Sequence, residues 1–346
     1  MAYSSPSMKQ IVLFAGVVCL AIFAEAGQGR AVADRLSDRE FWKIVTESSE
    51  PGGYFRSADI TNLTSNELLY GNVLNDLVGR TKPGGVYLGV GPEQNYNYIA
   101  ALKPRMAIIF DIRRGNLDLQ LMYKAIFELS KDRAEFMSFL FSRSRPGVLS
   151  SSSSARQLVR AFANSPVSSE TVFMKNLAAI NDRLTKVHGF ALLPRDLMAI
   201  ASIYRIFHDD GYAVRPFPSY DELMAATDQR GVERSYLATE ENYSFLKDLE
   251  SRNLVVPVVG DFAGPTAIRA IGRYLKEKNA TVTAFYLSNV EEYLDPGGKW
   301  IAFCRSVSTL PLDVSSTFIR SDSGFAGNFA LSLSPIMNDI KACAGK

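Results

Sequence analysis

The sequence predicts an α/β protein with a doubly wound, mostly parallel sheet. Two short apolar runs, at 86–90 and 106–110, flank a segment with helical character at 93–102. The same pattern returns much later, with further apolar runs at 254–259 and 282–287. Because strands of parallel sheets are covered on both faces, they form continuous apolar runs of this kind and do not alternate with polar residues.

The first strand, helix and second strand form a βαβ unit with a glycine turn. Gly89 and Gly91 stand at the end of the first run, and Asp111 closes the second. An acid about 20 residues beyond such glycines is typical of nucleoside-binding folds, where it binds ribose hydroxyls. The dinucleotide fingerprint has a third Gly or Ala where this chain has Gln94. The alternative is that the turn serves only strand-to-helix geometry.

The remaining elements continue the alternation. We expect crossover helices at 117–131 and 267–275, and last strands at 300–304 and 316–319. Before the sheet, Ser37 and Glu40 form a capping box, and another helix is predicted from Ser65. The predicted units are a signal peptide at 1–26, a helical lead-in at 27–80, a sheet domain at 81–131 and 252–325, and a helical insertion at 132–251.

The N-terminus has the pattern of a secretory signal. Lys9 precedes an apolar run at 11–24, and Ala24-Glu25-Ala26 is a typical cleavage site. We therefore expect a periplasmic or secreted protein without stable membrane insertion after cleavage. An uncleaved anchor is the alternative.

The composition excludes several classes. A net charge of +2 argues against a dedicated nucleic-acid binder. Three cysteines and two histidines show no metal-ligand spacing, so no metal is expected. After cleavage Cys304 and Cys343 would remain and could pair in an oxidising compartment, although sequence alone does not bring them together. Hydrolase, phosphate-loop and zinc-helix motifs are absent from the sequence.

The glycine turn and its acid resemble those of class I S-adenosylmethionine (SAM) methyltransferases. The segments GPEQNY and FDIRRGN also resemble parts of uncharacterised bacterial exported proteins with a methyltransferase-like fold. The resemblance implies that Gly89 and Gly91 lie under the methionine part of SAM and that Asp111 binds its ribose. It also implies that a lead-in folds over the cofactor, whereas a lead-in can equally cover the sheet.

The resemblance extends to two later strand ends. Asp261 would meet the adenine amine with Phe262 beside the ring, and Ser288-Asn289 falls at the family's catalytic motif, with Asn289 as the candidate catalytic residue. The complete candidate binding set is Gly89, Gly91, Glu93, Asn95, Asp111, Arg113, Asp261, Phe262 and Ser288.

Each polar candidate also has a purely structural interpretation. Asp261 could cap the helix that follows it. Asp111 could form a surface ion pair with Arg113 or Arg114, and Asn289 could close a turn. Four polar strand ends in the expected order nevertheless favour one shared pocket.

The sequence supports two functional hypotheses. The first is an exported, non-catalytic or diverged ligand-binding domain, because SAM is made in the cytoplasm. The alternative is an active SAM-dependent methyltransferase on an unidentified acceptor. Glu93 replaces the family's third glycine and is expected to place a carboxylate near that of methionine, which favours the first hypothesis. A small-molecule ligand fits both hypotheses, and protein partners stay open.

Overall fold

The computed structural model describes residues 1, 31–53, 62–214, 218–294, 298–323 and 329–344. Its centre is one mixed, mostly parallel sheet of six strands, with helices on both faces. The strands are β1 (Val86–Val90), β2 (Met106–Asp111), β3 (Val255–Val259), β4 (Val282–Ser288), β5 (Leu312–Ser323) and β6 (Phe329–Pro335). The α/β class predicted from the sequence is confirmed.

The strand order is β3-β2-β1-β4-β5-β6. Neighbouring strands are parallel except for β5 and β6, which pair antiparallel. The four strands predicted from continuous apolar runs, β1 to β4, lie together in this sheet. Their residues are almost all buried, as expected for strands covered by helices on both sides.

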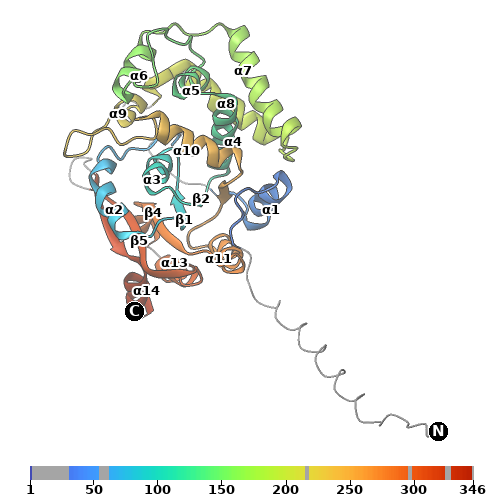
Figure 1. The fold of residues 1–346 in the computed structure, drawn as a ribbon, viewed down its shortest axis with the longest axis vertical. Coiled ribbons are helices and arrows are strands. Elements are labelled where there is room, and N and C mark those ends of the chain that lie inside the picture. Colours follow the sequence, from blue (N-terminus) through green and yellow to red (C-terminus); the bar gives the residue numbers. More distant parts are fainter. Residues whose placement is uncertain (2–30, 54–61, 215–217, 295–297, 324–328, 345–346) are drawn as a thin grey trace.

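Helices cover the sheet in two layers (Figure 1). Helices α3, α4 and α10 contact one another on one side, while α11 and α13 form the other layer with α1 beside β3. The bounds are α1 (Asp38–Ser48), α2 (Leu74–Arg80), α3 (Gln94–Leu102), α4 (Arg114–Leu129), α10 (Glu240–Ser251), α11 (Ala267–Glu277), α12 (Glu291–Leu294), α13 (Lys299–Val307) and α14 (Ile336–Ala344). The capping box of Ser37 and Glu40 is present at α1.

In the part of the chain that the structure describes, the long segment between β2 and β3 consists of helices joined by loops. Figure 1 shows most of its helices gathered at the end of the molecule opposite α13 and α14. The helices not yet given are α5 (Arg133–Leu140), α6 (Ala155–Ala163), α7 (Glu170–Asp182), α8 (Pro194–Asp210) and α9 (Tyr220–Met224). Buried aromatic rings, among them Phe127, Phe136 and Tyr236, pack this segment onto α3 and α4.

Two predicted elements near the ends of the sheet are wrong. The run 300–304 is not a strand but part of α13, because Trp300, Phe303, Cys304 and Val307 have the spacing of one helical face. No helix begins at Ser65 either; a 3-10 turn (Tyr70–Val73) precedes α2. The sheet also continues past residue 325, because β6 pairs with β5 there.

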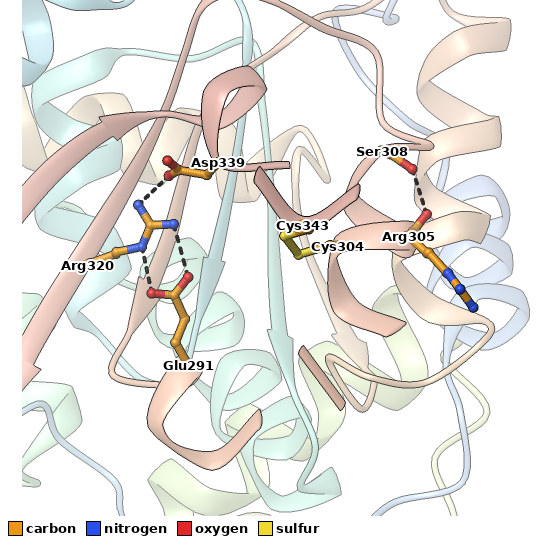
Figure 2. Close-up of a disulfide and its surroundings, with 7 residues drawn as sticks. All are labelled: Glu291, Cys304, Arg305, Ser308, Arg320, Asp339 and Cys343. Atoms are coloured by element: carbon orange, nitrogen blue, oxygen red, sulfur yellow. Dashed lines mark hydrogen bonds and ion pairs between the residues drawn. A yellow bond between two sulfur atoms is a disulfide. The ribbon is translucent and has the colours of Figure 1, made fainter. Parts of the chain in front are cut away.

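A disulfide and an arginine hold the C-terminal helices against the sheet (Figure 2). Cys304 on α13 is bonded to Cys343 on α14. Arg320 on β5 forms ion pairs with Glu291 of α12, at 2.6 Å, and with Asp339 of α14, at 2.7 Å. Both connections fix α12 and α13, which form one side of the cavity considered below.

The predicted signal segment, including Cys19, lies outside the described residues. Within the described ranges, none of the helices is long and apolar enough to cross a membrane.

Replacing Cys343 with serine should lower the free energy of unfolding by about 2–4 kcal/mol, because the disulfide closes a long loop in the unfolded chain. Its cysteines are 39 residues apart in sequence. Urea unfolding of both proteins, with and without reductant, measures the effect. Reductant should bring the wild type down to the variant and leave the variant unchanged; a wild type indifferent to reductant would contradict the pairing.

Candidate functional site

A cavity of about 370 Å³ opens at the carboxyl ends of the parallel strands. The strand order reverses between β1 and β4, and open α/β sheets bind ligands at such a reversal. Residues that follow β1, β2, β3 and β4 all contribute to its wall. Its lining residues are Asn62, Ser65, Asn66, Val90, Gly91, Pro92, Asp111, Ile112, Arg113, Asp261, Phe262, Tyr286, Ser288, Asn289, Val290, Tyr293, Leu294 and Lys299.

The cavity brings together most of the residues predicted from the sequence. The candidates that line it are Gly91, Asp111, Arg113, Asp261, Phe262, Ser288 and Asn289. Gly89, Glu93 and Asn95 do not line it. Their positions show how the turn between β1 and α3 is built.

The side chain of Asn95 closes this turn from inside the protein. Its Nδ2 donates to the carbonyl oxygens of Val90, Gly91 and Pro92 at 2.9, 3.2 and 2.7 Å. Its Oδ1 accepts a hydrogen bond from the Tyr87 hydroxyl at 2.9 Å. Asn95 is fully buried, so its amide holds the turn and does not face a ligand.

Gly89 makes room for that amide. A Cβ atom at position 89 would collide with Asn95 Oδ1 and with the Tyr87 ring. Gly91 has a different role, because its φ of +80° lies in the left-handed region that glycine adopts easily. Gly89 is therefore required for packing, and Gly91 for the direction of the chain beside the cavity.

Glu93 does not carry the role expected from the sequence. Its side chain is fully buried, and both carboxylate oxygens accept from the backbone N–H of Ser65, at 3.0 and 3.2 Å. The carboxylate thus fastens the lead-in to the start of α3. The expected like-charge contact with a methionine carboxylate has no structural basis, because Glu93 lies outside the cavity wall.

Asp111 and Arg113 form a clamp at the end of β2. Asp111 Oδ1 accepts from the Arg113 backbone N–H at 2.8 Å and from Nε at 3.0 Å, and Oδ2 accepts from Nη2 at 2.8 Å. The pair is largely buried, not the surface ion pair considered from the sequence. Because a carboxylate oxygen can accept about two hydrogen bonds, Oδ2 has capacity for a ligand hydroxyl.

The acid after β3 is fixed by a residue of the lead-in. Asp261 Oδ1 accepts from the N–H of Ala263 at 2.9 Å. Asp261 does not cap α11; Glu50 does, accepting from the N–H groups of Thr266 and Ala267 at 2.7 and 3.0 Å. Glu50 Oε2 also accepts from the N–H of Asp261. The capping interpretation of Asp261 is therefore wrong.

At the end of β4, Ser288 connects the cavity to a buried acid. Ser288 Oγ lies 2.6 Å from Oε1 of Glu67, whose side chain is fully buried. Asn289 Nδ2 donates to Glu292 at 3.1 Å, which orients its amide at the rim. In the described part of the chain, no cluster of side chains has the make-up of a metal site.

Several wall residues were not predicted from the sequence. Asn62 and Asn66 belong to the lead-in, and Lys299 begins α13. Glu67, also of the lead-in, lies behind the wall, where it contacts Ser288. If residues 300–304 are assigned to a helix, the sequence also indicates that this helix starts near Gly298 and Lys299. Nothing in the local sequence indicates that Glu67 lies behind β4, since the contact spans more than 200 residues.

The protein is thus an α/β protein with a cavity at the carboxyl ends of its parallel strands. A comparison with protein families matches residues 62–331 to a domain of unknown function, DUF7790. The match covers more than half of the chain, and the chain belongs to this family. No curated protein matches the sequence.

Changing Gly89 to alanine should lower the free energy of unfolding by about 1–3 kcal/mol, because the added methyl group overpacks the Asn95 contact. Gly115→Ala on α4 is the matched control, since a Cβ there meets nothing within 4 Å. Alanine at a helical position should be neutral or slightly stabilising. Urea unfolding compares them; equal stability of both variants would argue against the packing role of Gly89.

Proposed function

We propose that the chain is a Rossmann-type, methyltransferase-like domain that binds a nucleoside or similar polar small molecule and does not transfer methyl groups. The observation that carries the proposal is the cavity at the strand-order reversal, lined by the polar ends of β1, β2, β3 and β4. Its volume of about 370 Å³ falls within the usual range of ligand sites.

The character of the wall supports a nucleoside. Asp111 Oδ2 can accept from a sugar hydroxyl, and the largely buried clamp partner Arg113 orients the carboxylate. Phe262 provides an aromatic surface at the end of the neighbouring strand β3, beside the polar Asp261. Together these groups match the separated polar and aromatic parts of a nucleoside.

The glycine turn favours the non-catalytic form of the proposal. The N–H of Gly91 already donates to the carbonyl oxygen of Phe110, and Pro92 has no N–H. Neither residue can donate to the methionine part of SAM. We therefore expect SAM to bind no more tightly than adenosine.

The alternative function is SAM-dependent methyl transfer. It is favoured by one observation: Asp111, Asp261 and Asn289 line the same cavity, in the arrangement that the resemblance implies. Methyl transfer needs chiefly alignment of cofactor and acceptor, so the absence of a nucleophile does not oppose it.

Export to the periplasm or the medium remains part of the proposal. The disulfide between Cys304 and Cys343 supports it, because such bonds persist in oxidising compartments.

Adenosine should bind the purified protein, and Asp111→Ala should weaken binding about 10–100-fold, the scale of about 1–3 kcal/mol for losing a partner of a desolvated hydroxyl. Isothermal titration calorimetry with adenosine and with SAM measures both affinities. The control is Asp76→Ala, an acid of α2 that does not line the cavity.

The two functions give different results in this experiment. Binding of SAM much tighter than adenosine, together with formation of S-adenosylhomocysteine on addition of an acceptor, would replace the proposal with the methyltransferase alternative. Failure of both compounds to bind would remove the nucleoside assignment.

A further inference from the structure

A buried carboxyl group stands directly behind the cavity wall. Glu67 is fully buried, and its Oε1 lies 2.6 Å from the Oγ of Ser288, which lines the cavity. Ser288 has a φ of +50°, a left-handed conformation that is uncommon for serine. The unusual backbone brings its hydroxyl between Glu67 and the cavity.

Burial favours the neutral form of Glu67. It raises the pKa of this carboxyl, and the hydroxyl groups of Ser288, Tyr286 and Ser321 offset only part of that effect. The influences on this carboxyl include no cation from the described residues. A buried carboxylate without a cation is costly, so the protonated form is favoured over the charged one.

The hydrogen-bonding pattern places that proton. The hydroxyl groups of Tyr286 and Ser321 also lie near the carboxyl, but its shortest hydrogen bond is the 2.6 Å contact between Oε1 and Ser288 Oγ. A neutral carboxyl group is a stronger donor than a serine hydroxyl, and strong donors form the shortest hydrogen bonds. We therefore place the proton on Oε1, donated to Ser288 Oγ.

This arrangement leaves the hydroxyl hydrogen of Ser288 for another acceptor. Asn289 Oδ1 is 3.5 Å away, beyond the usual O–H···O range of about 2.5–3.0 Å. A ligand atom in the cavity can take that hydrogen. Were Glu67 ionised, Ser288 would have to donate to Glu67 and would offer the ligand only lone pairs.

We propose that Glu67, as a neutral acid, fixes Ser288 as a hydrogen-bond donor toward the cavity, so that the ligand presents an acceptor at the end of β4. The acceptor class is a carbonyl oxygen or an unprotonated ring nitrogen, such as those of a purine. The proposal rests on the proposed function for the existence of a ligand, but the protonation of Glu67 does not depend on it.

Affinity should accordingly fall as the pH rises and Glu67 loses its proton. The groups that face Glu67 from the neighbouring elements are Tyr87 on β1, Tyr98 on α3, Tyr286 and Ser288 on β4, and Ser321 on β5. Burial raises the pKa of all three tyrosines well above its usual value, so they stay neutral. The other charged groups of the cavity wall are Asp111, Arg113, Asp261 and Lys299.

The variant Glu67→Gln distinguishes a pH dependence caused by Glu67 from one caused by those other groups. Its amide donates to Ser288 as the neutral acid does but cannot ionise. In calorimetry with adenosine, wild-type affinity should be about tenfold or more lower at the highest pH at which the protein stays folded than at neutral pH, and Glu67→Gln should abolish that drop. Ser288→Ala should bind weakly at both pH values.

The matched control is Glu250→Gln. Glu250 is also a fully buried glutamate, with its pKa raised by burial to about 8, but it lies on α10 away from the cavity wall. This variant should keep the wild-type pH dependence. If Glu67→Gln binds adenosine more weakly than wild type at both pH values, or retains the drop, the proposal is overturned.

Infrared difference spectroscopy without ligand provides an independent measurement. The spectrum of wild type minus Glu67→Gln at neutral pH should show a carboxylic-acid C=O band; a carboxylate signal in its place would overturn the proposal. If Glu67→Gln does not fold, wild type minus Ser288→Ala should show the same band shifted, because its acceptor is gone. Absence of adenosine binding would refute the nucleoside assignment, while the infrared result still decides the state of Glu67.

Discussion

The amide of Asn95 is the contact on which the site depends. Its Nδ2 donates to three carbonyl oxygens of the turn after β1, and Gln120 Nε2 also donates to the oxygen of Gly91; a buried carbonyl oxygen left without a donor costs about 1–3 kcal/mol. The amide fits only because Gly89 has no side chain and because Tyr87 supplies the matching donor. The polar groups of the turn thus find their hydrogen-bond partners inside the protein, next to the cavity.

Three acids of the chain, of which Glu67 and Glu93 are buried, then attach distant parts of the chain to this frame. Glu93 binds the backbone of Ser65, Glu50 caps α11, and Glu67 contacts Ser288. Each contact joins the lead-in to a strand end or a helix start of the sheet domain. The lead-in therefore contributes directly to the cavity, because the positions of Ser65 and Asn66 in its wall follow from these contacts. This is more than the covering of an apolar sheet face.

The strands of the sheet could be predicted because each one is marked by a short run of neighbouring apolar residues. The runs at β1 to β4 are continuous and apolar, and parallel sheets place their carboxyl ends at one edge, so Asp111, Asp261 and Ser288 could be expected to meet. The run 300–304 failed because five apolar or aromatic residues fit either period. The directions of Glu93 and Glu67 could not be derived, since their partners lie 28 and 221 residues away in sequence. From the sequence one can predict that a buried polar side chain needs a hydrogen-bond partner. Which residue is that partner depends on the fold.

The same division explains why the fold predicts function only coarsely. A strand end beside a topological reversal produces a cavity in many α/β proteins, whatever the chemistry. The chemistry depends on which polar groups the protein has already used for itself. Here Asn95 and the N–H of Gly91 are engaged inside the protein, whereas Asp111 Oδ2 retains hydrogen-bonding capacity toward the cavity. Under the proposed function we expect ligand selectivity to come from the ends of β2 and β4, because the glycine turn between them supports the wall without contributing donors of its own.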